Sequence, residues 1–301
     1  MFVKKRLRTH LRKSVKVITV DSAADEVLSC EMMRSSALSA LKTRATPNLQ
    51  FVVRDKTHGS RRLISRGWGT DAFLKEIVQL FCRSRASMAR IIQNSRPIQC
   101  KFRHYIATSI RVVGTVAANM RAAAHRYESM QKPFGRSVLF IHAVIRTALW
   151  CTQTRTDESS RSAADWLLWI NNERCVQAAM MADASDQTLM LTRLLDSENV
   201  DPAILVGEVR TYLATIDLLF GDQERCLTVF GYTKVMLDTL SRPMVWSVKG
   251  TGCSIGSERG VPRSIILKCL DRMRCWIKLM RATLAVEFPD FEIAHAFDLD
   301  F

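Results

Sequence analysis

The stretch of residues 99–131 constrains the fold most strongly, because its apolar residues recur at the spacing of one helical face. That face contains Phe102, Ile106, Ile110, Val113, Ala117, Met120, Ala124 and Tyr127. Pro97 before the stretch and Lys132-Pro133-Phe134-Gly135 after it are typical of turns. We therefore expect one long helix that is buried along one side and cationic along another.

The same spacing recurs along most of the chain, whereas only one pair of strands is indicated. We expect further helices at residues 21–47, 70–92, 137–152, 162–182, 186–195, 201–221, 222–240 and 262–286. Residues 50–54 and 61–65 flank a segment that contains His58-Gly59, which predicts a β-hairpin with a basic tip. The predicted fold class is mainly α, with two helical lobes and one small β-hairpin in the N-terminal lobe.

The charge of the chain is distributed unevenly. Residues 1–150 contain 28 Lys and Arg against 8 Asp and Glu, a balance of +20, whereas residues 151–301 contain 16 against 21, a balance of −5. The polar residues 152–162 separate the two halves. We predict a basic arm (1–20), a basic N-terminal helical lobe (21–152), a C-terminal helical lobe (162–286) and an acidic, Phe-rich tail (287–301).

Composition indicates a folded protein with free thiols. A hydrophobic content of 48% with 12 Gly and 7 Pro argues against disorder. None of the 9 Cys forms a C-x-x-C pair, and most fall inside helical patterns, so we expect buried thiols in a reducing compartment, the cytoplasm or nucleus. The start of the chain lacks the apolar run of a secretory signal. It is either a nucleic-acid-binding arm or a targeting segment, and we favour the arm.

Two local patterns suggest chemistry. Gly252-Cys253-Ser254-Ile255-Gly256 matches the G-x-S-x-G nucleophile elbow, but no run of βα units precedes it, so we expect Ser254 to have no catalytic role. His142 and Arg146 share one face of an otherwise apolar helix, and we expect an internal carboxylate to pair with them. The six His never cluster with acids at helical spacing, so no metal or other cofactor is expected.

The basic first half is the feature that points to function. Its cations recur across the arm, the predicted hairpin and several helices, which suits contacts along a nucleic-acid backbone without sequence readout. Stacking of unpaired bases could add Phe51, Trp68, Phe102, His104 and Tyr105. The candidate nucleic-acid-binding residues are Lys4, Lys5, Arg6, Arg8, Arg12, Lys13, Arg54, Arg61, Arg62, Arg66, Arg83, Arg85, Lys101, Arg103, His104, Arg111, Arg121 and Arg126.

These patterns favour a non-enzymatic structural protein that coats or packages RNA in a nucleocapsid-like role. We expect residues 287–301 to dock on basic residues of the same chain, to dock on a neighbouring copy and so mediate self-association, or to fold back onto the C-terminal lobe. The alternative is a matrix or peripheral membrane protein. It would bind anionic lipid through the basic arm and the amphipathic helix of residues 262–286.

Overall fold

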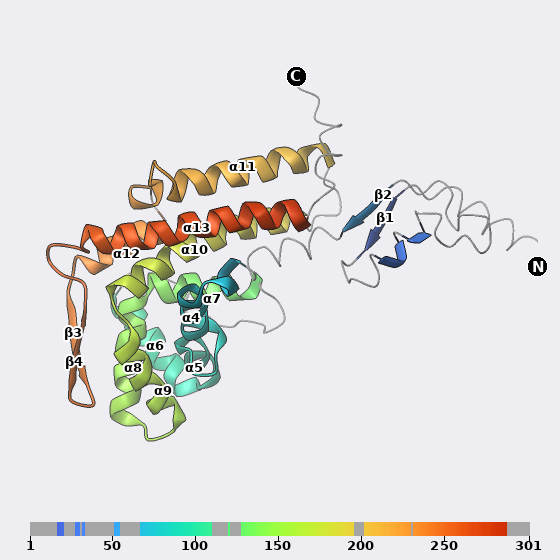
Figure 1. The fold of residues 1–301 in the computed structure, drawn as a ribbon. Coiled ribbons are helices and arrows are strands. Elements are labelled where there is room, and N and C mark those ends of the chain that lie inside the picture. Colours follow the sequence, from blue (N-terminus) through green and yellow to red (C-terminus); the bar gives the residue numbers. More distant parts are fainter. Residues whose placement is uncertain are drawn as a thin grey trace, which may run out of the picture. The chain divides into compact units, whose positions relative to one another are not determined.

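The computed structural model describes residues 17–20, 28–30, 32–33, 51–54, 67–109, 120, 128–195, 202–229 and 231–287. The chain forms two compact units. The first contains residues 1–63, 192–208 and 282–301, and the second contains residues 64–191 and 209–281. The described part is mainly helical, which confirms the predicted fold class (Figure 1).

Short strands and longer helices make up the described part of the chain. Four strands are described: β1 (Val17–Val20), β2 (Phe51–Arg54), β3 (Met244–Val248) and β4 (Thr251–Ile255). The helices of the first part are α4 (Ala72–Val78), the π-helix η2 (Gln79–Arg83), α5 (Met88–Asn94), α6 (Arg96–Ser109), α7 (Glu128–Leu139) and α8 (Ile141–Thr154). The later helices are α9 (Glu158–Trp169), α10 (Asn172–Leu195), α11 (Pro202–Phe220), the 3₁₀ turn η4 (Arg225–Leu227), α12 (Tyr232–Leu240) and α13 (Arg263–Glu287).

Several predicted helix starts are confirmed with their capping residues. The Asp71 carboxylate accepts hydrogen bonds from the backbone N–H groups of Phe73 (2.8 Å) and Leu74 (3.0 Å) at the start of α4. By contrast, α9 starts before the expected residue 162, because Asp157 caps it by accepting from the N–H of Ser160 (3.2 Å). Pro202 starts α11 as predicted, and the helix ends at Phe220 before Gly221. These caps satisfy N–H groups that have no partner inside the helix.

The break between α9 and α10 lies earlier than predicted. We expected helices at residues 162–182 and 186–195, but the chain breaks at Ile170-Asn171 and α10 then continues without interruption to Leu195. The Asn171 side chain accepts a hydrogen bond from the N–H of Arg174 (2.9 Å), as an N-cap does. Asp183 does not end the helix, because its carboxylate is occupied by the start of α12 and does not compete for the backbone of α10.

The predicted boundaries around the long central helix are wrong. Pro97 lies in the first turn of α6, and residues 132–135 lie inside α7. Gly135 serves packing instead of a turn, since a Cβ there would lie 2.7 Å from the hydroxyl oxygen of Tyr232. Residues 110–127, apart from Met120, lie outside the described residues, so the continuity of residues 99–131 stays a prediction.

Two further helix predictions are corrected. The helix expected at residues 70–92 is divided into α4, η2 and α5, because Ser84 is extended and Ser87 caps α5 by accepting from the N–H of Arg90 (3.4 Å). The helix expected at residues 222–240 starts only at Tyr232. Before it, Glu224 adopts a left-handed conformation (φ 46°), which a continuing α-helix does not permit.

The structure describes two strand pairs, and the predicted pairing of residues 50–54 with 61–65 stays a prediction. Phe51–Arg54 is the strand β2, but it pairs in parallel with β1, whose residues we had placed in the basic arm. A parallel pair needs a long connection and cannot be a hairpin. Residues 61–65 lie outside the described residues.

The hairpin that the structure describes lies in the glycine-rich segment of the second half (Figure 1). Strands β3 and β4 pair antiparallel around Lys249 (φ 51°) and Gly250 (φ 81°), both left-handed, as a tight two-residue turn requires. Trp246 and Val248 are buried, whereas Val245 and Ser247 are exposed, so the strand has the alternation of a half-buried sheet.

The second unit is held together by aromatic and mixed contacts between helices. Phe81 of η2 contacts the rings of Phe134, Trp166 and Trp169 edge-on, with centroids 5.7–6.1 Å apart. At the other end of the unit, the buried Tyr212 hydroxyl of α11 lies 2.8 Å from the Thr188 hydroxyl of α10. It also donates to the sulfur of Met280 in α13. These contacts place the long helices α11 and α13 side by side (Figure 1).

Residues 152–162 contain the end of α8, the connection at residues 155–157 and the start of α9, and these two helices pack against each other within the second unit. The predicted division into charged lobes at this point stays a prediction.

All nine cysteines carry free thiols, and six of them are buried: Cys30, Cys82, Cys151, Cys175, Cys226 and Cys269. Among the described helices, none is long and apolar enough by itself to cross a bilayer; residues 132–139 and α8 pass that test only as a pair bent by 87°.

Candidate nucleic-acid interface

The candidate interface is built on α6, which is amphipathic within the second unit. Ile98, Phe102 and Ile106 are buried at a spacing of four residues and fix the helix to the core. The opposite side of the helix is exposed at Arg96 and Arg103. The apolar face predicted for this segment is therefore confirmed as far as Ile106.

A mixed basic and aromatic cluster lies on the same helix. The Lys101 ammonium lies 5.4 Å from the centre of the Tyr105 ring. The exposed His104 ring lies 5.6 Å from the Tyr105 ring and is tilted against it by 58°. Aromatic rings beside cations are typical of surfaces on which unpaired bases stack.

Two further candidate cations precede α6 along the chain. Arg83 ends η2 and Arg85 lies in the turn before α5, and both side chains are exposed. Both lie at the break between η2 and α5, whereas the sequence pattern predicts an uninterrupted helix over residues 70–92. We call the exposed or half-exposed cations of residues 79–109 the η2–α6 surface; they are Arg83, Arg85, Arg90, Arg96, Lys101 and Arg103.

The next feature of the η2–α6 surface is the lack of described acids that pair with its cations. Within the part of the chain that the structure describes, none of its Lys and Arg forms an ion pair with a carboxylate. The sequence contains the reason in part, because residues 77–127 include no Asp or Glu at all. That acid-free run is a sharper signal than the charge balance of the whole first half, and it could have been found from the sequence.

The other candidate residues are not tested by the structure. Arg54 lies in β2, but its side chain is outside the described residues. The remaining candidates also lie outside them: Lys4, Lys5, Arg6, Arg8, Arg12, Lys13, Arg61, Arg62, Arg66, Arg111, Arg121 and Arg126. The structure thus brings Arg83, Arg85, Lys101, Arg103 and His104 into one helical unit and does not place the others.

Two of the proposed stacking residues are core residues, so that prediction is wrong for them. Phe102 is fully buried in the apolar face of α6. Trp68 is buried and stacks on Trp276 of α13, with ring centroids 4.5 Å apart and planes 10° apart. A Cβ at Gly67 would lie 2.4 Å from the Trp276 ring nitrogen, which shows how closely the chain approaches this stack. His104 is exposed and Tyr105 is half-buried.

The G-x-S-x-G segment does not form a nucleophile elbow. Ser254 lies within β4, opposite Val245 in an antiparallel hairpin, and its side chain is exposed. An elbow needs a sharp turn between a strand and a helix, which β4 does not provide. Within the described ranges, no three His, Cys, Asp or Glu side chains come together in a way that could hold a metal ion.

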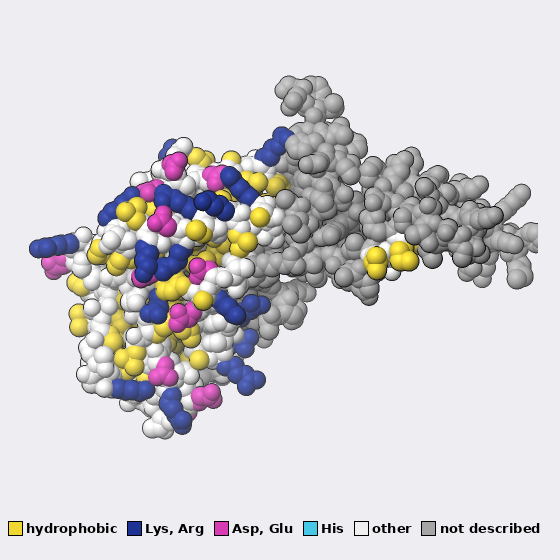
Figure 2. Space-filling model, viewed as in Figure 1, with side chains coloured by type: hydrophobic (Ala, Val, Ile, Leu, Met, Phe, Trp, Pro, Cys, Tyr) yellow, Lys and Arg dark blue, Asp and Glu magenta, His cyan; other side chains and the backbone are white. Residues whose placement is uncertain are grey.

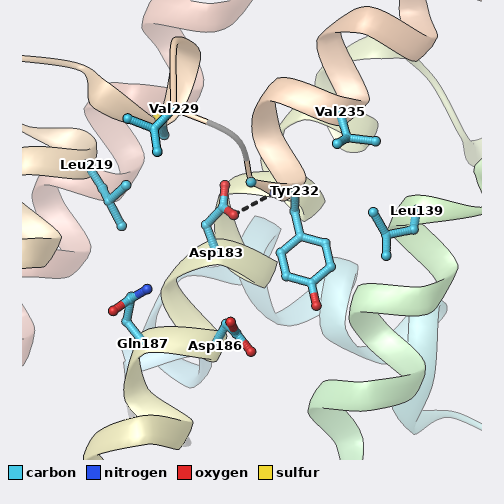
Figure 3. Close-up of a pocket in the computed structure, with 10 residues that line it drawn as sticks. Leu139, Asp183, Asp186, Gln187, Leu219, Val229, Tyr232 and Val235 are labelled. Atoms are coloured by element: carbon cyan, nitrogen blue, oxygen red, sulfur yellow. Dashed lines mark hydrogen bonds between the residues drawn. The ribbon is translucent and has the colours of Figure 1, made fainter.

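A pocket of about 360 Å³ lies between α7, α10, α11 and α12, and Figure 3 shows the residues that line it. Its most buried polar group is Asp183, whose carboxylate accepts from the N–H of Tyr232 (2.7 Å) and from the N–H (2.9 Å) and hydroxyl (2.6 Å) of Thr233. Gly231 permits this approach, since a Cβ there would lie 2.7 Å from the Asp183 carboxylate. Asp183 therefore caps α12 from another helix.

Electrostatics agree with a structural role for the polar groups of this pocket. Burial raises the pKa of Asp183, although its hydrogen bonds with Thr233 and Tyr232 lower it in part. Burial and the neighbouring Asp186 and Asp183 also raise the pKa of Tyr232. Neither shift favours a reactive anion at neutral pH, and the three donors to Asp183 already satisfy its carboxylate.

The charged groups of α8 differ from the prediction. Arg146 is exposed, and among the described residues no carboxylate pairs with it or with His142. The charged groups that act on the His142 imidazole are Arg146 and Arg242, both cations. The expected internal acid is thus replaced by a second arginine.

Comparisons of the chain with models of protein families, with curated proteins and with solved structures found no match.

Proposed function

We propose that the protein binds nucleic acid, with RNA as the favoured partner, and that the η2–α6 surface contacts the phosphate backbone. The proposal rests on one observation: six cations clustered within residues 79–109 have no carboxylate partners among the described residues, whereas Arg272, Arg274 and Arg281 of α13 in the same unit do. Unpaired surface cations retain their attraction for a polyanion, and binding releases the counterions of the phosphates.

The size of the surface sets the expected strength of its binding. Arg96 and Arg103 are separated by seven residues, which corresponds to roughly 10 Å along the helix axis. That length accommodates about three nucleotides at the axial rise of a duplex strand, roughly 3.4 Å. The α6 cations therefore contact a few phosphates, and long-range coverage of an RNA requires the other basic segments or several copies of the protein. This suits a coating or packaging role without enzymatic chemistry.

The alternative, binding to an anionic membrane through residues 262–286, has less support. The apolar residues of α13 are buried within the protein, including Leu270, Met273 and Ile277. Its cations Arg272, Arg274 and Arg281 form ion pairs with Glu173, Glu224 and Asp217. In this structure the helix has neither a free apolar face nor unpaired charge at these positions for a lipid surface.

The unaltered protein allows a direct test, because two exposed thiols lie on the two kinds of helix. Cys100 lies on α6 between Arg96 and Arg103, and Cys275 lies on α13. We expect single-stranded RNA to slow modification of Cys100 by the neutral reagent N-ethylmaleimide severalfold and to leave Cys275 unchanged, as measured by peptide mass spectrometry. Equal rates at Cys100 with and without bound RNA would contradict the proposed surface. Anionic liposomes at the same salt concentration test the alternative in the same assay.

A further inference from the structure

The pocket between α7, α10, α11 and α12 combines an apolar wall with polar groups at one edge. The wall consists of aliphatic side chains that are not fully buried: Leu139, Leu219, Val229 and Val235. Figure 3 shows the Asp186 carboxylate and the Tyr232 hydroxyl at the edge opposite to Val229 and Val235. The volume of about 360 Å³ lies near the lower end of the range for small-molecule sites, roughly 300–1,000 Å³, so the pocket can hold a small ligand with an apolar part.

Three polar groups that line the pocket have no partner within the described ranges. The Asp186 carboxylate forms neither an ion pair nor a hydrogen bond there, and the same holds for the side-chain amide of Gln187 and the hydroxyl of Tyr232. Asp186 is exposed, and the other two side chains are half-buried, so a ligand can reach them. Asp183 differs, because three donors already satisfy its carboxylate. The free oxygens of the three groups can accept hydrogen bonds from a bound ligand.

The charge of the pocket favours a cationic ligand. Asp183 and Asp186 line it, whereas no Lys or Arg among the described residues does. Burial, followed by the charges of Asp186 and Asp183, raises the pKa of Tyr232, in agreement with an acidic surrounding of its hydroxyl. Arg136 of α7 opposes this effect but does not line the pocket. A metal ion fits less well than an organic cation, since the described residues bring no three His, Cys, Asp or Glu side chains together to hold one.

We propose that the pocket binds the protonated form of a primary aliphatic amine, independently of the nucleic-acid binding proposed for the η2–α6 surface. The ammonium group donates its three hydrogen bonds to the Asp186 carboxylate, the Gln187 amide oxygen and the Tyr232 hydroxyl. The alkyl chain covers Leu219 and Val235 and removes their apolar surface from water. An alcohol of the same length offers the same chain without the charge, and a carboxylate offers it with the opposite charge.

The experiment is an NMR titration of the whole protein with ¹³C-labelled Leu and Val methyl groups. n-Hexylamine, hexan-1-ol and hexanoate are compared at pH 7 and constant ionic strength. We expect hexylamine to cause saturable shifts of the Val229 and Val235 signals, which are assigned by their loss in Val229→Ala and Val235→Ala. The signal of Val245, which is exposed on β3 and does not line the pocket, should not move. Hexan-1-ol should bind about fivefold more weakly because it lacks the charge, and hexanoate should not bind.

Variants of exposed acids separate the ammonium site from unspecific attraction. Asp186→Asn should weaken binding of hexylamine about fivefold and leave hexan-1-ol unchanged, because only the ammonium group loses a charged partner. The matched control is Glu258→Gln, an exposed acid outside the pocket without an ion pair among the described residues, which should change neither affinity. The proposal is overturned if hexylamine causes no saturable shift of the Val229 and Val235 signals. Equal affinities for hexylamine and hexanoate overturn it as well, and so does an unchanged affinity for hexylamine in Asp186→Asn.

Discussion

The η2–α6 surface and helix α13 both carry several cations on elements that bury an apolar face. They differ in whether these cations form ion pairs with carboxylates. On α13, Arg272 lies 2.6 Å from Glu173, Arg274 lies 3.2 Å from Glu224, and Arg281 pairs with Asp217. Over α13, Lys and Arg side chains alternate with Asp and Glu (Figure 2). On the η2–α6 surface, no such pair exists among the described residues.

The difference teaches that local charge balance is a poor guide to which cations are available. The acids that neutralise α13 come from α10, α11 and the η4 region, and Glu173 and Arg272 are 99 residues apart in the chain. Arg272, Arg274 and Arg281 of α13 join helices through ion pairs, whereas no cation of the η2–α6 surface pairs with a carboxylate among the described residues. A cation without a partner costs the fold little to change and contributes most to binding.

Charge reversal should give the largest effect, and it should be confined to one region. Arg96→Glu together with Arg103→Glu is expected to weaken binding of single-stranded RNA by about tenfold or more, because two phosphate contacts are replaced by repulsion. Fluorescence anisotropy at several salt concentrations measures both the affinity and the reduced salt slope. The matched control is Arg259→Glu with Lys278→Glu, which changes the same charge at exposed sites without ion pairs among the described residues. Equal losses in both double variants would remove the distinction between the regions.

Removing the buried cap should give the largest loss of stability. Asp183→Ala leaves the N–H groups of Tyr232 and Thr233 without their acceptor, and we expect about 2–3 kcal/mol of destabilisation. Chemical denaturation measures this change. Binding of RNA to the folded protein at low temperature should persist. If Asp183→Ala unfolds at the same denaturant concentration as the wild type, the cap across helices is not a stabilising contact.

Replacing Glu173, which pairs with cations of α13, should cause a smaller loss of stability that depends on pH. Burial raises the pKa of Glu173, but hydrogen bonds from Arg272 and Lys268 lower it further, so the pKa in the folded protein lies below its ordinary value. The resulting stability is present above the unfolded pKa and is lost as pH falls towards the folded pKa. We expect Glu173→Gln to cost about 1 kcal/mol at neutral pH and to cost progressively less in acid.

The control for this comparison lies on the other region. Arg103→Gln should leave the free energy of unfolding unchanged within about 0.5 kcal/mol at every pH, because Arg103 has no acid partner to lose among the described residues. Thermal melts from pH 3 to 7 measure both variants. A loss for Arg103→Gln as large as that for Glu173→Gln would show that the η2–α6 cations also stabilise the fold.

Ser254→Ala should give the smallest effect of all. Its side chain is exposed on β4, which belongs neither to the η2–α6 surface nor to α13, so neither RNA affinity nor melting temperature should change measurably. The same binding and melting assays measure it. Covalent labelling of Ser254 by a fluorophosphonate probe would contradict this prediction, because only an activated serine reacts in this way.

The sequence by itself determined the helical class and several helix ends, since both depend on local patterns. The apolar spacing of α6, Asp71 and Asp157 at helix starts, and the limits of α11 and α13 were all readable from neighbouring residues. The sequence also contained the acid-free run of residues 77–127, which marks the η2–α6 surface. Periodicity and capping act within a few residues and do not need the rest of the fold.

Only the tertiary structure decided the features that depend on distant residues. Gly135 resembled a turn residue until the ring of Tyr232 was found against it, and Asp183 resembled a helix boundary until its hydrogen bonds to α12 were seen. The strand β2 pairs with β1, which lies far from it in the sequence. In the same way, Arg242 took the place beside His142 where an acid was expected. Each of these depends on contacts between segments far apart in sequence, which local patterns do not encode.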